Sequence, residues 1–496
     1  MDFKRYINNI AANPKGVFLQ NLGLKQTIIK NTFWLTISEA ITMAVKFFLF
    51  VYIARILGAG EYGKLAFGIA FTGLLIVFSD LGLSKIVNRE FARDEEPLYH
   101  LHAVLALRSI LSLATLILIF FGSLFLSANW EMRRIILVMG VYGLINSFFA
   151  FLYSFFRARQ KMEYQSWSDI LQAVAMTAFC LTVLFCWPSA LNLSLAYLLS
   201  ASFCLLVILL FFHFKLARLR MLVDKKVWRS YLTMSWPIAS AVFVGSIYAN
   251  LDSAMLGFLG QMKQVGWYNA AQKIVDIAAI PAGLLSMSFL PALSRFAVSD
   301  PRKLQKTWNY YAGASWFLAW PALLGGWALS FRIIDFIYDP AFFPAVPAFH
   351  LLLLAGVLGT ILNPFNHALF VSGRQDKVFL VTLAAAVVNV LSNVVLIPLY
   401  SLYGAACSMI VSFAVSNLLA LCFVLKQTTV RPFNLHVLNV FVSALLASLL
   451  MLLIITQPFF QDWHILLMVA LAMAIYGAGF LGLYKVARVL NHKQDD

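Results

Sequence analysis

The stretch ARILGAGEYGKLAF, Ala54 to Phe67, decides how this chain is interpreted. Its glycines fit the dinucleotide fingerprint G-x-G-x-x-G, and Gly58 to Lys64 fits all but the last residue of a phosphate-binding P-loop. Both motifs need a preceding β-strand, and a P-loop also needs Ser or Thr after its lysine. Here an apolar run of helical length precedes Gly58, and Leu65 follows Lys64. We therefore interpret both matches as coincidences and expect no nucleotide or other cofactor.

The composition around this stretch is that of a membrane protein. Of the 496 residues, 62% are hydrophobic and 12% are charged, whereas a soluble domain is about 25% charged. Apolar runs of about 20 residues, the length that crosses a bilayer, recur to the end of the chain. They predict an all-α polytopic membrane protein with about fourteen transmembrane helices. The short connections leave no room for a soluble catalytic domain, so the chain is predicted not to be an enzyme.

The basic residues predict the orientation in the membrane. They concentrate in alternate loops, and the loop from Phe214 to Arg229 alone holds Lys215, Arg218, Arg220, Lys225, Lys226 and Arg229. The positive-inside rule then places both termini in the cytoplasm. This distribution accounts for the net charge of +16 without a nucleic-acid partner. The histidines and cysteines show no metal-ligand spacing, so no metal site is predicted. Residues 3–12 are either a helix on the membrane surface or a solvated tail.

The turn at Gly58 has a counterpart in the second half of the chain. FLGQMKQVGWYNAA, 258–271, repeats the pattern of ILGAGEYGKLAFGI, 56–69, with Gly58 matching Gly260 and Gly63 matching Gly266. Glycine supplies the positive φ that ends one helix and turns the chain into the next. A second pair, FRARQKMEYQ at 156–165 and FVSGRQDKVF at 370–379, shares Arg-Gln and a nearby lysine. The two pairs predict an internal repeat.

The predicted repeat consists of two six-helix lobes. Because six is even, both lobes enter the membrane from the same side and are related by an axis along the membrane normal. Paired lobes around a central cavity are typical of alternating access. The predicted parts are a cytoplasmic N-terminal segment (1–27), a first six-helix lobe (28–214), a basic cytoplasmic linker (215–229), a second six-helix lobe (230–426), two additional helices (436–486) and a cytoplasmic tail (487–496).

Ionisable residues inside the predicted helices are the candidate site. Each costs about 2.5–3.5 kcal/mol on insertion scales, so such groups normally face a cavity or a partner. Lys46 and Lys273 are predicted to line the cavity and attract an anion, with Asp252 able to pair with Lys273. The acids that could titrate or hold a cation are Glu39, Asp80, Asp252 and Asp276. That these charges only lock neighbouring helices together is an equally open interpretation.

Other polar residues receive different roles. Arg108 and Asp169 lie near helix ends, where snorkelling to the interface is the expected behaviour. Asn389 and Asn393 share one helix face and are expected to form interhelical hydrogen bonds. Asn250, Gln272 and Asn363 also lie inside helices and are added to the candidate cavity.

Four stretches together carry a family resemblance. They are FVYIARILGAGEYGKLAFGIAF (50–71), SDLGLSKIVNREFAR (79–93), LDSAMLGFLGQMKQVGWYNAAQKI (251–274) and LSNVVLIPLYSLYGAACSMIVS (391–412). As an ordered set they resemble Wzx-type polysaccharide flippases, whose superfamily also includes the lipid II flippases and the MATE-type drug/cation antiporters. The resemblance implies two six-helix lobes around a cationic cavity, with Lys46 and Lys273 as the positions that could serve. The acids close to these lysines depart from a strongly positive cavity.

The resemblance also implies a function. The chain would move a polyprenyl-diphosphate-linked oligosaccharide across a bacterial inner membrane for O-antigen, capsule or exopolysaccharide assembly, in contact with membrane lipid and other polysaccharide-assembly membrane proteins. One alternative is a drug or cation antiporter, which would carry a strong acidic cluster. A membrane-embedded glycan polymerase or glycosyltransferase would need a sizeable external loop, and a structural scaffold would not need the buried charges.

Overall fold

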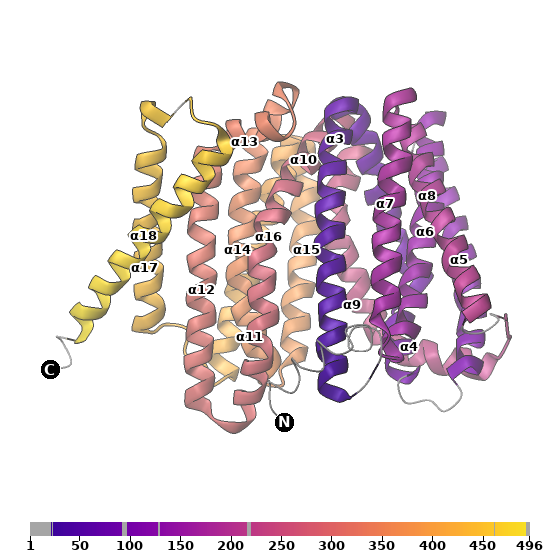
Figure 1. The fold of residues 1–496 in the computed structure, drawn as a ribbon, viewed down its shortest axis with the longest axis horizontal. Coiled ribbons are helices and arrows are strands. Elements are labelled where there is room, and N and C mark those ends of the chain that lie inside the picture. The colour runs from indigo at the N-terminus through magenta and orange to yellow at the C-terminus, as the bar shows by residue number, and fades with distance from the viewer. Residues whose placement is uncertain are drawn as a thin grey trace, which may run out of the picture. The chain divides into compact units, whose positions relative to one another are not determined.

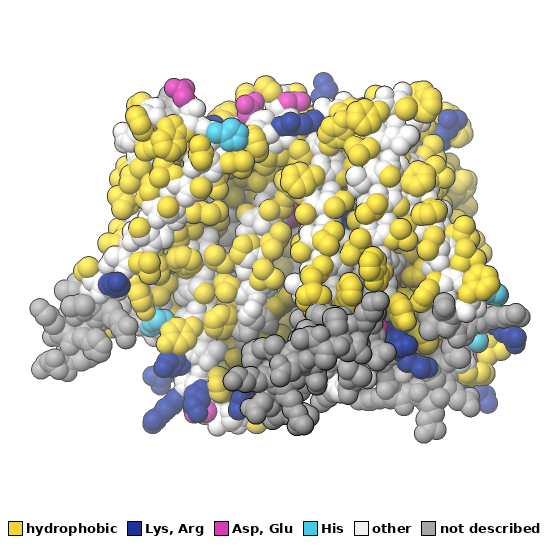
Figure 2. Space-filling model, in the orientation of Figure 1, with side chains coloured by type: hydrophobic (Ala, Val, Ile, Leu, Met, Phe, Trp, Pro, Cys, Tyr) yellow, Lys and Arg dark blue, Asp and Glu magenta, His cyan; other side chains and the backbone are white. Residues whose placement is uncertain are grey.

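The computed structural model describes residue 21 and residues 23–91, 97–126, 129–215, 220–460 and 462–492. The described residues form helices and no β-strand. Twelve helices are long and apolar enough to cross a membrane, or thirteen if one bent pair counts as a span. The chain is therefore an all-α multi-pass membrane protein. On the face shown in Figure 2, hydrophobic side chains cover the helices along their length, and Lys and Arg lie near the helix ends. Residues 3–12, for which a surface helix and a solvated tail were both open, lie outside the described residues.

The chain divides into two compact units, 1–250 and 251–496. The boundary falls inside a helix, α9, rather than in the loop before residue 230. Within the predicted linker 215–229, residues 220–224 are non-helical and α9 begins at Lys225. Unit 1 contains α3 (Leu24–Asp80), α4 (Leu83–Phe91), α5 (Pro97–Leu126), α6 (Trp130–Ala158), α7 (Met162–Cys186), α8 (Ala190–Lys215) and most of α9 (Lys225–Phe258).

Unit 2 contains the end of α9 and the remaining helices (Figure 1). They are α10 (Met262–Ala278), α11 (Ile280–Ser299), α12 (Pro301–Ala328), α13 (Ser330–Ile337), the 3₁₀ helix η1 (Pro340–Ala345), α14 (Val346–Val371), α15 (Gln375–Tyr400), α16 (Leu402–Gln427), α17 (Leu435–Ile455), the 3₁₀ helix η2 (Pro458–Phe460) and α18 (Ile465–His492). The pair α12 and α13, bent by 77°, is the one that adds a thirteenth span.

Each unit has its own apolar core. In unit 1 the short helix α4 is amphipathic, and its apolar residues Leu83, Ile86, Val87 and Phe91 are buried against aromatic residues of α6. This spacing places all four on one helix face. In unit 2, α17 and α18 pack with the end of α12 through a cluster that includes Leu329, Ala447 and Met468.

The glycine turns confirm part of the predicted pattern. Gly58 and Gly260 both have positive φ, of 69° and 72°. The second matched pair, Gly63 and Gly266, behaves differently, because both are buried positions inside α3 and α10. Gly58 interrupts α3, a helix of 57 residues, and α3 rather than a strand precedes the glycines of the nucleotide motifs. Lys64 is paired with Glu61 at 2.6 Å and with Glu131 at 3.1 Å.

The turn at Gly260 shares its backbone geometry with two further turns, although their residues differ. The left-handed residues are Gln160, Gly260 and Gly373. In each turn the left-handed residue donates its N–H three residues back, and the next residue donates five residues back. These two bonds define the Schellman motif. By backbone conformation Gln160 matches Gly373, two residues away from the match of the two Arg-Gln pairs.

Candidate functional site

A buried carboxyl group lies at the centre of a polar cluster in unit 2. Asp252, near the end of α9, is 5% exposed. The hydroxyl of Tyr268 on α10 donates to its Oδ2 at 2.6 Å, and the amide of Asn393 on α15 donates to its Oδ1 at 2.5 Å. Asn389 donates to the same oxygen at 3.4 Å and accepts from Asn393 at 3.1 Å. The prediction that Asn389 and Asn393 form interhelical hydrogen bonds is confirmed.

These three donors are neutral groups. A buried carboxyl group is costly in its ionised form unless a cation lies beside it, and protonation removes that cost by removing the charge. Tyr268 and the asparagine amides satisfy its lone pairs without supplying a positive charge. The cluster is thus chemically suited to exchange a small cation or a proton, and it contains an acid that the sequence predicted for this role.

The structure places Lys273 with a different acid from the one expected. Its Nζ lies 3.6 Å from Oδ2 of Asp276, one turn further along α10. Gln272 donates to Oδ1 of the same Asp276 at 2.8 Å. Asp252 is instead held by Tyr268 and the two asparagines, so the expected pair between Asp252 and Lys273 was wrong. The Lys273 and Asp276 side chains are 40% and 49% exposed. Three of the predicted site residues therefore form one accessible cluster on α10.

The predicted residues of unit 1 are spread over two helices. Glu39 and Lys46 are both exposed on the first part of α3. Asn250, on α9, donates to the carbonyl of Ser246 at 3.0 Å and lies against Gly73, where an added Cβ would sit 2.8 Å from its Oδ1. In unit 2, Asn363 is half-buried on α14.

Asp80 belongs to a second buried network, with Arg108. The guanidinium of Arg108, on α5, is fully buried and pairs with the Asp80 carboxylate at the end of α3. It also donates to the Ser84 hydroxyl at 3.0 Å and to the Ser147 hydroxyl at 2.6 Å. The ring of Phe151 lies 5.2 Å from it. The expectation that Arg108 snorkels to the interface was wrong, because both terminal nitrogens of its guanidinium find partners inside unit 1.

A second buried ion pair was missed from the sequence. Lys30 of α3 lies 2.9 Å from Glu163 of α7, and their side chains are 1% and 4% exposed. Beside it, Asn31 donates to Gln160 at 2.8 Å across the α6–α7 turn. Lys30 falls inside the first apolar run, which is the only signal that the sequence offered. Among the described residues, no group of three or more His, Cys, Asp or Glu side chains is placed to hold a metal ion.

The sequence profile of the polysaccharide biosynthesis protein family matches residues 28–297, more than half of the chain. The chain belongs to this family. The family is one of membrane transporters, so the chain is a transporter rather than an enzyme. This agrees with the short loops and with the resemblance carried by the four sequence stretches.

Relatives of the chain come from bacteria and an archaeon. An uncharacterized membrane protein in the cps region of Klebsiella pneumoniae is 23% identical over 82% of this chain and 84% of its own length. The probable flippase AglR of Haloferax volcanii is 25% identical over 48% of this chain and 50% of its own length. The lipopolysaccharide biosynthesis protein WzxC of Escherichia coli is 20% identical over 72% of this chain and 73% of its own length.

Solved structures share the fold. The lipid II flippase MurJ, in an inward closed conformation, has a TM-score of 0.75 at 17% identity, covering 91% of this chain and 98% of MurJ. An inward-facing multidrug resistance MATE family transporter of the MOP superfamily has a TM-score of 0.61 at 16% identity, covering 76% of this chain and 94% of that transporter. The fold is therefore of the MurJ and MATE type.

Proposed function

We propose that the chain is a flippase that moves a polyprenyl-diphosphate-linked oligosaccharide from the cytoplasmic to the outer leaflet of a bacterial inner membrane. The observation that carries this proposal is the family match over residues 28–297, together with a relative named as a probable flippase. A diphosphate-sugar headgroup cannot cross about 30 Å of hydrocarbon unaided. A polar path for the headgroup solves this, while the lipid tail stays in the bilayer.

The proposed architecture has fourteen crossings. Gly58 divides the 57 residues of α3 into two lengths that each suffice for a span, which adds one crossing to the thirteen counted with the bent pair. The lobes at 28–214 and 230–426 then carry equivalent turns at Gln160 and Gly373, each between its fourth and fifth helix. The helices at 436–486 are the additional pair. Both termini are proposed to be cytoplasmic, and the lobes to alternate between inward and outward access.

Lys46 and Lys273 are proposed to bind the diphosphate. Lys46 is exposed on α3, which is long and apolar enough to cross a membrane, and the Lys273 side chain is 40% exposed on α10. A cationic side chain inside the membrane is favoured by an anion beside it. Lys273 keeps its Asp276 neighbour in the resting state, and the arriving diphosphate would compete for the ammonium group. The amides of Asn250, Gln272 and Asn363 are proposed to contact the glycan.

Asp252 is proposed as the residue that couples transport to an ion or proton. Its three neutral donors leave room for one positive charge, as a proton or as a small cation. Asp80 is less suited, because Arg108 already neutralises it. Glu39 and Asp276 are exposed acids that would assist release of the anion.

The test measures which leaflet holds the lipid-linked glycan. In cells depleted of the protein, the glycan is expected to accumulate on the cytoplasmic leaflet, inaccessible to an external lectin or glycosidase. Lys46→Ala and Lys273→Ala should reproduce this accumulation at normal protein level. Lys263→Ala, an exposed lysine in the first turn of the same helix α10, is the matched control and should export normally. Full export by both alanine variants would remove these lysines from the site.

One observation favours a second candidate, a drug or cation antiporter. Asp252 is a buried acid, and Asp276 and Glu39 are accessible acids in the same type of fold as a MATE transporter. An antiporter would extrude lipophilic cations, and its loss would leave every lipid-linked glycan correctly exported. The depletion experiment separates the two, because only the flippase reading predicts a stranded glycan.

A further inference from the structure

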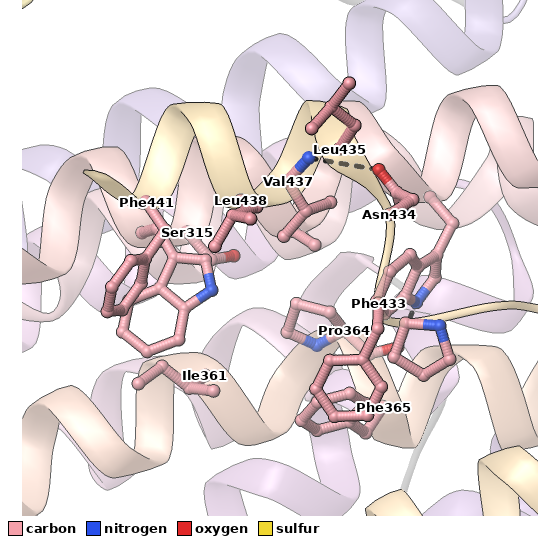
Figure 3. A pocket seen from close by; sticks show the side chains of 14 residues that line it. Ser315, Ile361, Pro364, Phe365, Phe433, Asn434, Leu435, Val437, Leu438 and Phe441 are labelled. Carbon is pink, nitrogen blue, oxygen red and sulfur yellow. Dashed lines mark hydrogen bonds between the residues drawn. The ribbon is translucent and has the colours of Figure 1, made fainter. Parts of the chain in front are cut away.

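A cavity of about 510 Å³ lies within unit 2 between α12, α14 and α17. This volume is within the range of about 300–1,000 Å³ that is typical of ligand pockets. Figure 3 shows Ile361 and Phe441 at one end and Phe365, Phe433 and Asn434 at the other. The remaining lining is also mainly aromatic and aliphatic, including Trp308, Trp316 and Leu438.

Three polar side chains of the lining, those of Trp308, Ser315 and Asn434, already form hydrogen bonds inside the protein. The indole N–H of Trp308 donates to the carbonyl of Pro364 at 2.9 Å. The Ser315 hydroxyl donates to the carbonyl of Tyr311 at 3.0 Å. Asn434 caps α17 through the N–H of Val437 at 3.0 Å and donates to Asn309 at 2.8 Å. These groups leave an occupant little to bond with, so the cavity suits a hydrocarbon chain.

One end of the cavity lies at a basic end of unit 2. Arg431 directly precedes the lining residues Pro432 and Phe433, and Phe433 is 76% exposed. The backbone of Arg431 is fixed by Gln305, which accepts from its N–H at 2.7 Å and donates to its carbonyl at 3.0 Å. The first two turns of α12 add Arg302, Lys303 and Lys306 at the same end. Asp300 offsets part of this charge through Lys303, at 3.4 Å.

The proposed transport residues Lys273 and Asp276, on α10, do not line the cavity. Asn363, on α14, lies beside the lining residue Pro364 in the sequence. Within the same span of α12 and α17 the two helices approach closely, since an added Cβ at Gly313 would sit 3.4 Å from Val440. The cavity is therefore a local gap in the packing of α17, the first of the two additional helices, against α12.

We propose that this cavity holds one acyl chain of an anionic phospholipid from the surrounding bilayer, with the lipid phosphate beside Arg431. The chain fills the gap between α12 and α17 with hydrocarbon, and the guanidinium provides two parallel donors for phosphate oxygens. The negatively charged headgroup also relieves the repulsion among the basic residues at the start of α12. The lipid is a structural part of the transporter and not its cargo.

The test measures phospholipid retention by the full-length protein in detergent, using native mass spectrometry. Phosphatidylglycerol is expected to be retained more strongly than phosphatidylcholine with the same chains. Arg431→Ala should weaken phosphatidylglycerol binding about fivefold, since one basic residue near a lipid phosphate contributes on the order of that factor. The control is Arg229→Ala, which removes an exposed arginine of α9 in unit 1 and should leave this binding unchanged.

Two pocket-filling variants test the acyl-chain site directly. Ala312→Phe adds a ring from α12, and Leu438→Trp adds one from the exposed side of α17, so the test survives if one of them fails to fold. Each folded variant should lose the tightly held phosphatidylglycerol. The proposal is overturned if both folded variants retain it, if phosphatidylcholine binds equally well, or if polyprenyl phosphate displaces it at lower concentration than phosphatidylglycerol itself. In that last case the cavity would belong to the transported lipid.

Discussion

Asn393 and Asp252, 141 residues apart in the sequence, meet in a hydrogen bond of 2.5 Å inside unit 2. The contact joins α15 to the end of α9, and Tyr268 joins α10 to the same carboxyl group. One buried acid thus fixes three helices. Under the proposed coupling role, a proton or cation bound there would change the interactions of all three helices at once.

Asp252→Asn is predicted to stop glycan export while the protein still reaches the membrane. The amide keeps the size of the side chain but cannot be ionised, so it cannot release a proton or attract a cation. Export is measured by surface glycan staining and protein level by immunoblot. Asp376→Asn, an exposed acid on α15, is the control and should export normally. Normal export by Asp252→Asn would exclude the coupling role.

Arg108→Ala is predicted to destabilise unit 1 strongly. It leaves the Asp80 carboxylate without its buried counter-charge, and breaking a buried pair in this way typically costs about 3–5 kcal/mol. The free energy of unfolding in detergent is the measurement. Arg89→Ala, which breaks an exposed pair with Glu90, should cost only about 0–1 kcal/mol. Equal effects of the two substitutions would show that the Arg108 network does not stabilise the fold.

Gly404→Ala is predicted to disrupt the α15–α16 hairpin. The added Cβ would collide with the backbone carbonyl of Leu396, which cannot move as a side-chain end could. The matched substitution is Gly477→Ala in α18, where nothing lies within 4 Å of the new atom. Because alanine is a better helix former, Gly477→Ala should be neutral or stabilising by about 0.5–1 kcal/mol. The thermal unfolding temperature should therefore fall for Gly404→Ala and should rise or stay unchanged for Gly477→Ala.

The first turn of α12 is predicted to loosen in acid. Asp300 caps this helix by accepting from the backbone N–H groups of Lys303 and Arg302, and these bonds lower the pKa of its carboxyl group. A lowered folded-state pKa gives stability that is present above the unfolded value of about 3.9 and lost as the pH falls through the folded value. The protection of the backbone amides of residues 302–305 from hydrogen exchange should fall below about pH 4, and Asp300→Asn should remove this pH dependence. An unchanged profile in that variant would contradict the cap.

The fold was largely predictable from the sequence because the length of each apolar run can be counted without knowing which helices it contacts. The positive φ at Gly58 and Gly260 followed from glycine at a helix end. The turns at 156–165 and 370–379 were matched through their shared Arg-Gln pair. That match differs by two residues from the match of their backbone conformations. Gln160, which is not glycine, adopts the left-handed conformation that Gly373 adopts in the other half.

The candidate site was less predictable because its partners come from distant helices. Asp252 was identified as a candidate, but Tyr268 was not, and Lys273 was considered as a residue with which Asp252 could pair. Lys30 and Glu163 are 133 residues apart, and no spacing rule connects them. The snorkelling expected of Arg108 was wrong because position along a helix does not reveal what the neighbouring helices offer.

The helix α9 has a practical consequence for dissecting this transporter. Its first turns belong to unit 1, where Trp228 donates to the carbonyl of Ala103 at 2.8 Å, and its last turns carry Asp252 into unit 2. Two co-expressed fragments divided after Asn250 would each inherit a broken helix with unpaired backbone groups inside lipid. A division at residues 220–224, which are non-helical, would leave α9 whole on the second fragment. Two co-expressed fragments divided there are therefore expected to restore export better than fragments divided after Asn250.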